Sequence, residues 1–173
     1  MAEPTEQRVS EHYARPDLER AIEAALVASG KNLDQLTPDD LAPVDEFHTG
    51  GRQATIELAA HMAIAPEMHL LDVGCGIGGP SRYFARAHGC RVKGIDLTAD
   101  YVRTAARLAQ RVGLGDRVEY RQASALALPF APETFDGAYM LHVGMNIAAG
   151  TGRDYHSPLC ALGLGEPGKI SIM

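Results

Sequence analysis

The spacing of apolar and polar positions divides the chain into an N-terminal helical part and a longer part in which strands and helices alternate. Apolar residues recur at helical spacing over 17–29. Thr37 and Pro38 mark the start of a second helix, and residues 52–64 predict a third that Pro66 closes. The first dozen residues are charged and are expected to fray.

The second part predicts an α/β fold. Short apolar runs indicate four strands, over 69–73, 90–96, 117–123 and 135–141. Between the first three strands, one helix is expected over 80–87 and another from Thr98, which caps it, to Gly113, which ends it. Two strand–helix–strand units in succession predict a doubly wound parallel sheet.

Composition narrows the classes of partner. The 173 residues carry 16 Lys and Arg against 22 Asp and Glu, a net charge of -6, which argues against a basic surface for nucleic acid or anionic membrane. No apolar run approaches the length of a membrane span, and the polar N-terminus predicts no signal peptide. The three scattered cysteines lack metal-ligand spacing, so we expect reduced thiols, no metal site and a cytoplasmic protein.

A glycine-rich stretch, "LLDVGCGIGG" at 70–79, follows the first predicted strand. Gly74, Gly76 and Gly79 match the dinucleotide pattern G-x-G-x-x-G, and Gly74, Gly76 and Gly78 match the pattern G-x-G-x-G. Either match alone is weak. The loop is compatible with a dinucleotide phosphate, a mononucleotide phosphate or a nucleoside without phosphate.

Two carboxylates near this loop favour a nucleoside. Asp72 ends the first strand two residues before Gly74, where it would repel a pyrophosphate but suits a ligand that carries an ammonium group. Asp96 ends the second strand, about 20 residues beyond the first glycine, where a carboxylate accepts both hydroxyls of a ribose. A carboxylate at the place of Asp96 fits a dinucleotide as well, so Asp72 is the residue that favours a nucleoside over a dinucleotide.

Four ordered motifs together resemble the class I S-adenosylmethionine-dependent methyltransferases, over roughly 66–147: "LLDVGCGIGG", "GIDLT", "ASALALPF" and "FDGAYMLHV". The stretch "LAPVDEFHTGGRQATIELA" is similar to the helical cap of the small-molecule group that includes sarcosine, dimethylglycine and sterol methyltransferases. The resemblance implies a Rossmann-like parallel sheet over 66–173, incomplete at its C-terminus, behind an N-terminal helical cap over 1–65.

The resemblance also implies contacts with S-adenosylmethionine, the methyl donor of that family. Asp72 with Gly74, Cys75 and Gly76 would contact the methionine part, and Asp96 would contact the ribose. Leu97, Ser124 and Ala125 would contact the adenine, and Leu141 with His142 would lie near the sulfonium. The family usually has Asp where this chain has Ser124. Because an uncharged hydroxyl accepts more weakly, we expect a weaker bond to the adenine amino group.

Methyl transfer from a sulfonium needs alignment and exclusion of water, and a general base only when the acceptor must lose a proton. His142 and His48 are the candidate bases, and Asn146 is a candidate for orienting the acceptor. The alternative for both histidines is a solvated or internally bonded side chain, and for Cys75 a space-filling role. The acceptor is expected to be a small molecule bound between the cap and the sheet, through oxygen, nitrogen or carbon.

Residues 148–173 depart from the family pattern. Glycines and a proline make 150–165 a poor helix, and "KISIM" at 169–173 is at best the start of a fifth strand. The chain is therefore expected to be truncated, with an exposed sheet edge that promotes self-association or with disorder after about residue 150. Three functions stay open: a small-molecule methyltransferase, a nucleoside-binding module without turnover, and an NAD-dependent oxidoreductase, which Asp72 and "ALALPF" disfavour.

Overall fold

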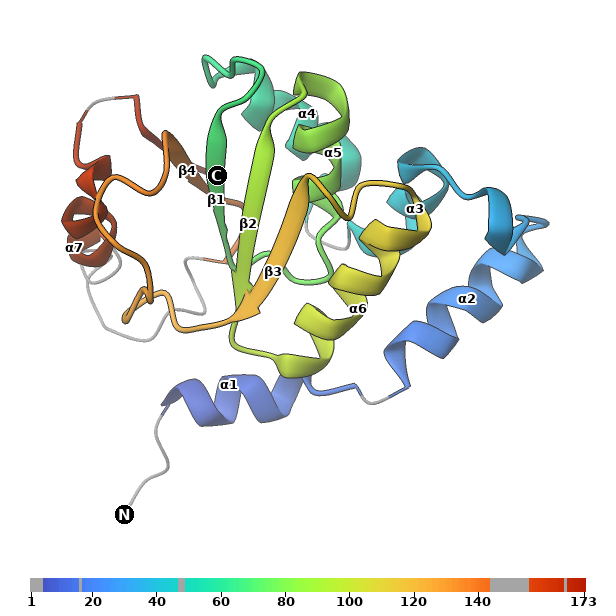
Figure 1. The fold of residues 1–173 in the computed structure, drawn as a ribbon. Helices are drawn as coiled ribbons and strands as arrows, with labels where there is room; N and C mark the ends of the chain where they lie inside the picture. Colours follow the sequence, from blue (N-terminus) through green and yellow to red (C-terminus); the bar gives the residue numbers. More distant parts are fainter. Residues whose placement is uncertain (1–4, 16, 47–48, 144–155, 167) are drawn as a thin grey trace.

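In the computed structural model, which describes residues 5–15, 17–46, 49–143, 156–166 and 168–173, the described strands form one parallel sheet (Figure 1). The strand order is β3-β2-β1-β4-β5, and every neighbouring pair is parallel. The strands are β1 (His69–Val73), β2 (Arg91–Asp96), β3 (Val118–Gln122), β4 (Gly137–Met140) and β5 (Ile170–Ile172). The predicted α/β fold is confirmed, and "KISIM" contains the fifth strand.

The N-terminal helices differ from expectation at the start of the chain. The first dozen residues were expected to fray, but they contain helix α1, whose Ser10 hydroxyl donates to the Leu97 carbonyl oxygen at 3.3 Å. The prediction was wrong because this tertiary contact holds a segment with little apolar surface of its own. The N-terminal helices are α1 (Thr5–Tyr13), α2 (Leu18–Ala28), the short 3-10 helix η1 (Leu33–Gln35), α3 (Pro38–Asp45) and α4 (Gly51–Ala60).

Helices cover both faces of the sheet. α5 (Gly79–His88) and α6 (Ala99–Arg111) connect the first three strands. They pack with α4 on one face, where Phe84 stacks on Tyr139 of β4 with ring centroids 4.3 Å apart. The opposite face is covered by residues that follow β3 and by α7 (His156–Leu159) with the π-helical turn η3 (Cys160–Leu164).

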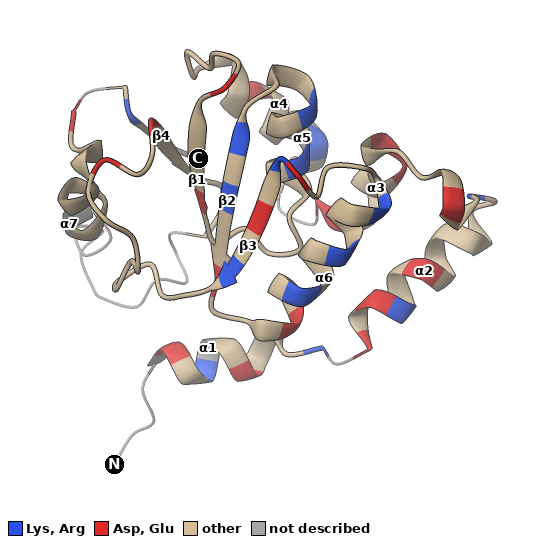
Figure 2. Ribbon diagram, viewed as in Figure 1, with Lys and Arg blue, Asp and Glu red and all other residues tan. Residues whose placement is uncertain are grey.

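Ion pairs connect the N-terminal helices to this α/β layer. Glu19 and Glu23 of α2 pair with Arg107 and Arg111 of α6 along a solvent-facing seam (Figure 2). Because these charges are exposed, each pair contributes little to stability. No helix among the described residues is long and apolar enough to cross a membrane.

The strand order determines where a ligand can bind. From β1 the chain proceeds to β2 and β3 on one side, and β4 and β5 lie on the other. The loops that follow β1 and β4 therefore diverge, and the crevice between them lies at the carboxyl ends of the strands, where open α/β sheets bind ligands. Helix α1 lies across the same end of the sheet (Figure 1).

Candidate functional site

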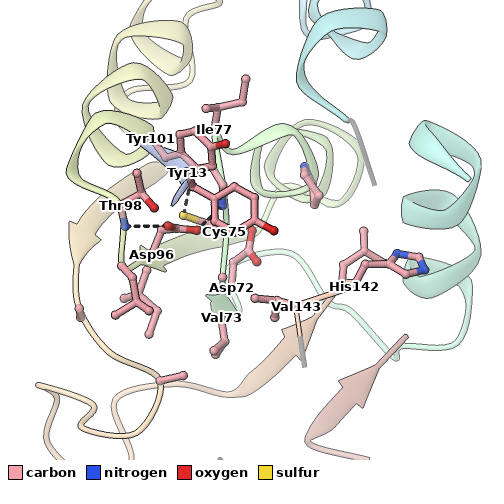
Figure 3. A pocket seen from close by; sticks show the side chains of 18 of the residues that line it. Tyr13, Asp72, Val73, Cys75, Ile77, Asp96, Thr98, Tyr101, His142 and Val143 are labelled. Carbon is pink, nitrogen blue, oxygen red and sulfur yellow. Dashed lines mark hydrogen bonds between the residues drawn. The ribbon is translucent and has the colours of Figure 1, made fainter. Parts of the chain in front are cut away.

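A pocket of about 260 Å³ opens at this crevice. Its walls come from the glycine loop after β1, the ends of β2 and β3, the residues after β4, and helices α1 and α6 (Figure 3). Of the residues implied by sequence as cofactor contacts, most line it: Asp72, Gly74, Cys75, Gly76, Asp96, Leu97, Ala125, Leu141 and His142. Ser124 is the exception, since it is not among the residues that line the pocket.

The glycine loop depends on glycine at its first position. Gly74 has φ +78, and a Cβ atom there would collide with the side chain of Val143, which follows β4. The backbone N–H groups of Gly74 and Cys75 both donate to the Ile95 carbonyl oxygen, at 2.8 and 2.9 Å. The loop is thereby fixed to the end of β2, and its turn brings it beside Asp96.

Asp96 organises the middle of the pocket. One carboxylate oxygen accepts from the Gly76 N–H at 3.0 Å, and the other accepts from the Thr98 N–H at 2.8 Å. Thr98 was expected to cap the following helix; it occupies the N-cap position of α6, but its side chain makes no capping bond. Asp96, two residues before Thr98, instead accepts the bond from the Thr98 N–H and holds the start of α6 in place. Burial raises the pKa of Asp96, and a carboxylate keeps further acceptor sites for ligand hydroxyls.

Asp72 is the most deeply buried acid of the pocket. It is 2% exposed, and the Ser81 hydroxyl of α5 donates to it at 2.6 Å. Burial raises its pKa to about 7, and the nearby charge of Asp96 acts in the same direction. A carboxyl group poised near neutrality ionises readily when a cationic ligand group arrives.

The helix at the start of the chain contributes residues that the sequence did not indicate. Glu6 and Tyr13 of α1 line the pocket, and the Tyr13 ring lies next to Tyr101 of α6 with centroids 6.2 Å apart (Figure 3). The Ser124 hydroxyl donates to the Glu6 carboxylate. No local pattern signals these contacts, since the partners lie far apart in the sequence.

The candidate catalytic residues are only partly within the described structure. His142 lines the pocket with φ +54, its backbone N–H donates to the Met173 carbonyl oxygen at 2.8 Å, and its ring lies at the opposite end from Asp96 (Figure 3). His48 and Asn146 lie outside the described residues. Burial raises the pKa of Cys75 well above the ordinary thiol value, which supports a space-filling side chain.

The charge of the lining selects among ligands. Among the described residues, the lining includes four acids, Glu6, Asp45, Asp72 and Asp96, and no lysine or arginine. Asp45 is neutralised by a buried ion pair with Arg82 of α5, which leaves three carboxyl groups facing the cavity. Such a lining favours a cation and opposes a diphosphate. Within the described residues, no group of His, Cys, Asp and Glu is arranged to hold a metal ion.

Comparison with known proteins points to one family. Residues 70–155 match the sequence model of a methyltransferase domain. Over these residues the chain is similar to the class I S-adenosylmethionine-dependent methyltransferases. Methyltransferase phqN of Penicillium fellutanum is 38% identical to this chain over 84 residues, which are 49% of the chain and 26% of that protein. Sterol 24-C-methyltransferase ERG6B of Gibberella zeae is 36% identical over 49% of the chain and 22% of its own length.

Solved structures confirm the methyltransferase fold. Geranyl diphosphate methyltransferase in complex with S-adenosylmethionine superimposes with a TM-score of 0.58 at 26% identity, over 64% of this chain and 44% of that one. The [4+2]-cyclase SpnF gives a TM-score of 0.67 at 22% identity, over 92% and 56%. The chain thus spans less than two thirds of the length of each of these proteins. S-adenosylmethionine is the cofactor of the family, and the acidic pocket fits its cationic groups.

Proposed function

We propose that this chain binds S-adenosylmethionine and forms the cofactor-binding part of an enzyme that methylates a small molecule. The observation that carries the proposal is the pocket at the switch point of the sheet, whose described lining has three carboxyl groups besides the ion-paired Asp45 and no lysine or arginine. S-adenosylmethionine carries a sulfonium and an ammonium group, whereas NAD carries a diphosphate. The lining charge therefore favours the first ligand.

The residues that line the pocket suit each part of the cofactor chemically. Asp96 accepts hydrogen bonds from the ribose hydroxyls, and Asp72 pairs with the ammonium group beside the turn at Gly74. Leu97 and Ala125 provide apolar surface for the purine ring. When bound, the cofactor supplies an already activated methyl group, so the protein chiefly orients the reactants and excludes water.

The methyl acceptor belongs at the end of the pocket formed by Leu141 and His142. His142 is our candidate for removing a proton from an oxygen or nitrogen acceptor, with His48 and Asn146 as further candidates from sequence. A sterol methyltransferase and a geranyl diphosphate methyltransferase among the similar proteins support a small-molecule acceptor with a hydrocarbon part. Carbon, nitrogen and oxygen acceptors are all compatible with this arrangement.

Calorimetry with S-adenosylhomocysteine and with NAD tests the proposal. We expect S-adenosylhomocysteine to bind and NAD to bind more weakly or without measurable heat. Asp96→Ala should cost roughly 1.5–3 kcal/mol of binding free energy, the worth of hydrogen bonds to a charged group. Asp116→Ala, at an exposed position between α6 and β3, is the matched control. Tighter binding of NAD would contradict the proposal.

A second candidate is a cofactor-binding protein without methyl transfer. It stays a candidate because the fold is shared with a [4+2]-cyclase over 92% of the chain, and a shared fold does not determine the reaction. Transfer of a labelled methyl group from the cofactor to a panel of sterol, prenyl and amine acceptors distinguishes the two. Labelled product supports the methyltransferase; cofactor binding without labelled product supports the alternative.

A further inference from the structure

The contact between Glu6 and Ser124 joins the first helix to the loop after β3. The Ser124 hydroxyl donates to one carboxylate oxygen of Glu6, and the same Ser124 oxygen accepts from the Leu126 N–H at 2.9 Å. Since a hydroxyl has a single hydrogen, Ser124 has none left to donate to a ligand. Glu6 lines the pocket, whereas Ser124 is not among the lining residues. Of these two side chains, the one that lines the pocket is therefore Glu6.

The surroundings of Glu6 are those of a base-binding compartment. Asp96, at the end of β2, is the carboxylate placed for a ribose. Beyond it, on the side of β3, the pocket is lined by the apolar residues Leu97, Ala123 and Ala125. Ala123 and Ala125 flank Ser124 in the chain, so the residue that holds Glu6 lies between two residues of this apolar wall. A flat base between apolar walls would meet one carboxylate at its edge.

We propose that Glu6 is the group that recognises the base, by accepting a hydrogen bond from the exocyclic amino group of adenine, with Ser124 as its positioning residue. The inference rests on the proposed binding of S-adenosylmethionine. The family's usual acid is missing at 124, and this chain supplies a carboxylate to the same place from helix α1. A bond to an ionised acceptor is stronger than a bond to a neutral hydroxyl.

The proposal makes the pocket selective for a donor at the 6-position of the purine. Adenine presents an amino group there, and hypoxanthine presents a carbonyl oxygen. A carboxylate attracts the first and repels the second, so deamination of the base exchanges an attractive contact for a repulsive one. A glutamine at the same place can donate or accept, and it would tolerate both bases.

The test compares S-adenosylhomocysteine with its deaminated counterpart, S-inosylhomocysteine, by calorimetry on the full chain. The wild-type protein should prefer the adenine ligand by more than about tenfold. Glu6→Gln should reduce this preference to about threefold or less, and Ser124→Ala should reduce it in part by freeing the Glu6 side chain. Glu11→Gln is the control, because it lies on the same helix and its side chain bonds Gln7 there.

A rescue experiment separates recognition from a structural role. Ser124→Asp alone would place a second carboxylate against Glu6, so it should weaken binding. Combined with Glu6→Gln, it returns one carboxylate to the base edge and should restore the preference for adenine. The ratio of the two affinities is measured on one protein preparation, so partial unfolding of a variant does not change it.

The outcomes distinguish this inference from the proposed function. If the wild-type chain binds neither ligand, the proposed cofactor binding itself fails. If it binds S-adenosylhomocysteine and Glu6→Gln keeps the full preference for adenine, cofactor binding stands and the role of Glu6 is overturned. A lost preference that the double variant restores supports the inference.

Discussion

The buried carboxyl group of Asp72 predicts that cofactor binding depends on pH in a defined direction. Burial raises its pKa to about 7 in the ligand-free protein. An ammonium group beside it would stabilise the ionised form and lower that pKa, so binding below neutrality releases a proton. Affinity should therefore rise with pH between 6 and 8.

The size of the effect follows from the titration. With a pKa of about 7, Asp72 is mostly protonated at pH 6 and mostly ionised at pH 8. If one proton must leave on binding, affinity at pH 6 is about tenfold lower than at pH 8, equivalent to about 1.4 kcal/mol. Asp72→Asn should weaken binding at pH 8 and flatten the pH dependence, while still accepting the bond from Ser81.

The same residue affects stability with the opposite consequence. Between an ordinary aspartate pKa of 3.8 and the raised value of about 7, the folded protein retains a proton that the unfolded chain has released. Stability contributed by this group therefore falls as pH rises through that window, and the cost at pH 8 is at most about 4 kcal/mol. Asp72→Asn should make the ligand-free protein more stable at pH 8 in urea unfolding.

Calorimetry with S-adenosylhomocysteine at pH 6, 7 and 8, in buffers with different heats of ionisation, measures both affinity and proton release. Asp116→Asn serves as the exposed control. The reasoning is refuted if affinity is unchanged over this range with no proton released, or if Asp72→Asn keeps the full pH dependence.

Three further predictions concern the framework of the site. Arg82→Met leaves the Asp45 carboxylate buried without its partner and should cost about 3–5 kcal/mol in urea unfolding, much of which adding Asp45→Asn should recover; an unchanged midpoint would contradict this. Gly74→Ala and Gly113→Ala both force alanine to positive φ, and each should lower the free energy of unfolding by about 1 kcal/mol. Only the alanine at 74 would also collide with Val143, so only Gly74→Ala should abolish ligand binding in thermal-shift assays. Ile172 is 50% exposed on β5, and no other described strand pairs with the outer side of β5. Light scattering should therefore show self-association, which Ile172→Lys should reduce. Val27→Lys, at a 56% exposed position on α2, is the control and should leave it unchanged.

Much of the fold and the centre of the site could be predicted because their signals are local. The strand over 69–73 has the predicted bounds, and the carboxyl ends of neighbouring parallel strands meet at one edge. Asp72, the glycine loop and Asp96 therefore converge whatever the rest of the chain does. The family resemblance was likewise carried by short motifs, each at the end of a strand.

The remainder depended on contacts between distant segments. Glu6 and Ser124 are 118 residues apart, and nothing near either position signals the pairing. Arg82 is 1% exposed although it resembles a solvated side chain in a polar helix, because its partner Asp45 comes from α3. Helix α1 was missed for the same reason, since it is held by contacts to the sheet more than by apolar periodicity.

The attachment of α1 also sets an order for how the pocket can form during synthesis. Ser10 and Glu6 of α1 bond Leu97 and Ser124, which lie 87 and 118 residues away, and Arg15, just after the helix, bonds Asp100, 85 residues away. Because α1 precedes these partners in the chain, it must wait, without these tertiary bonds, until β3 and the residues after it have been synthesised. Contacts of such long sequence separation slow folding. We expect the nascent chain to gain its base-binding wall last, after the parallel strands have already paired.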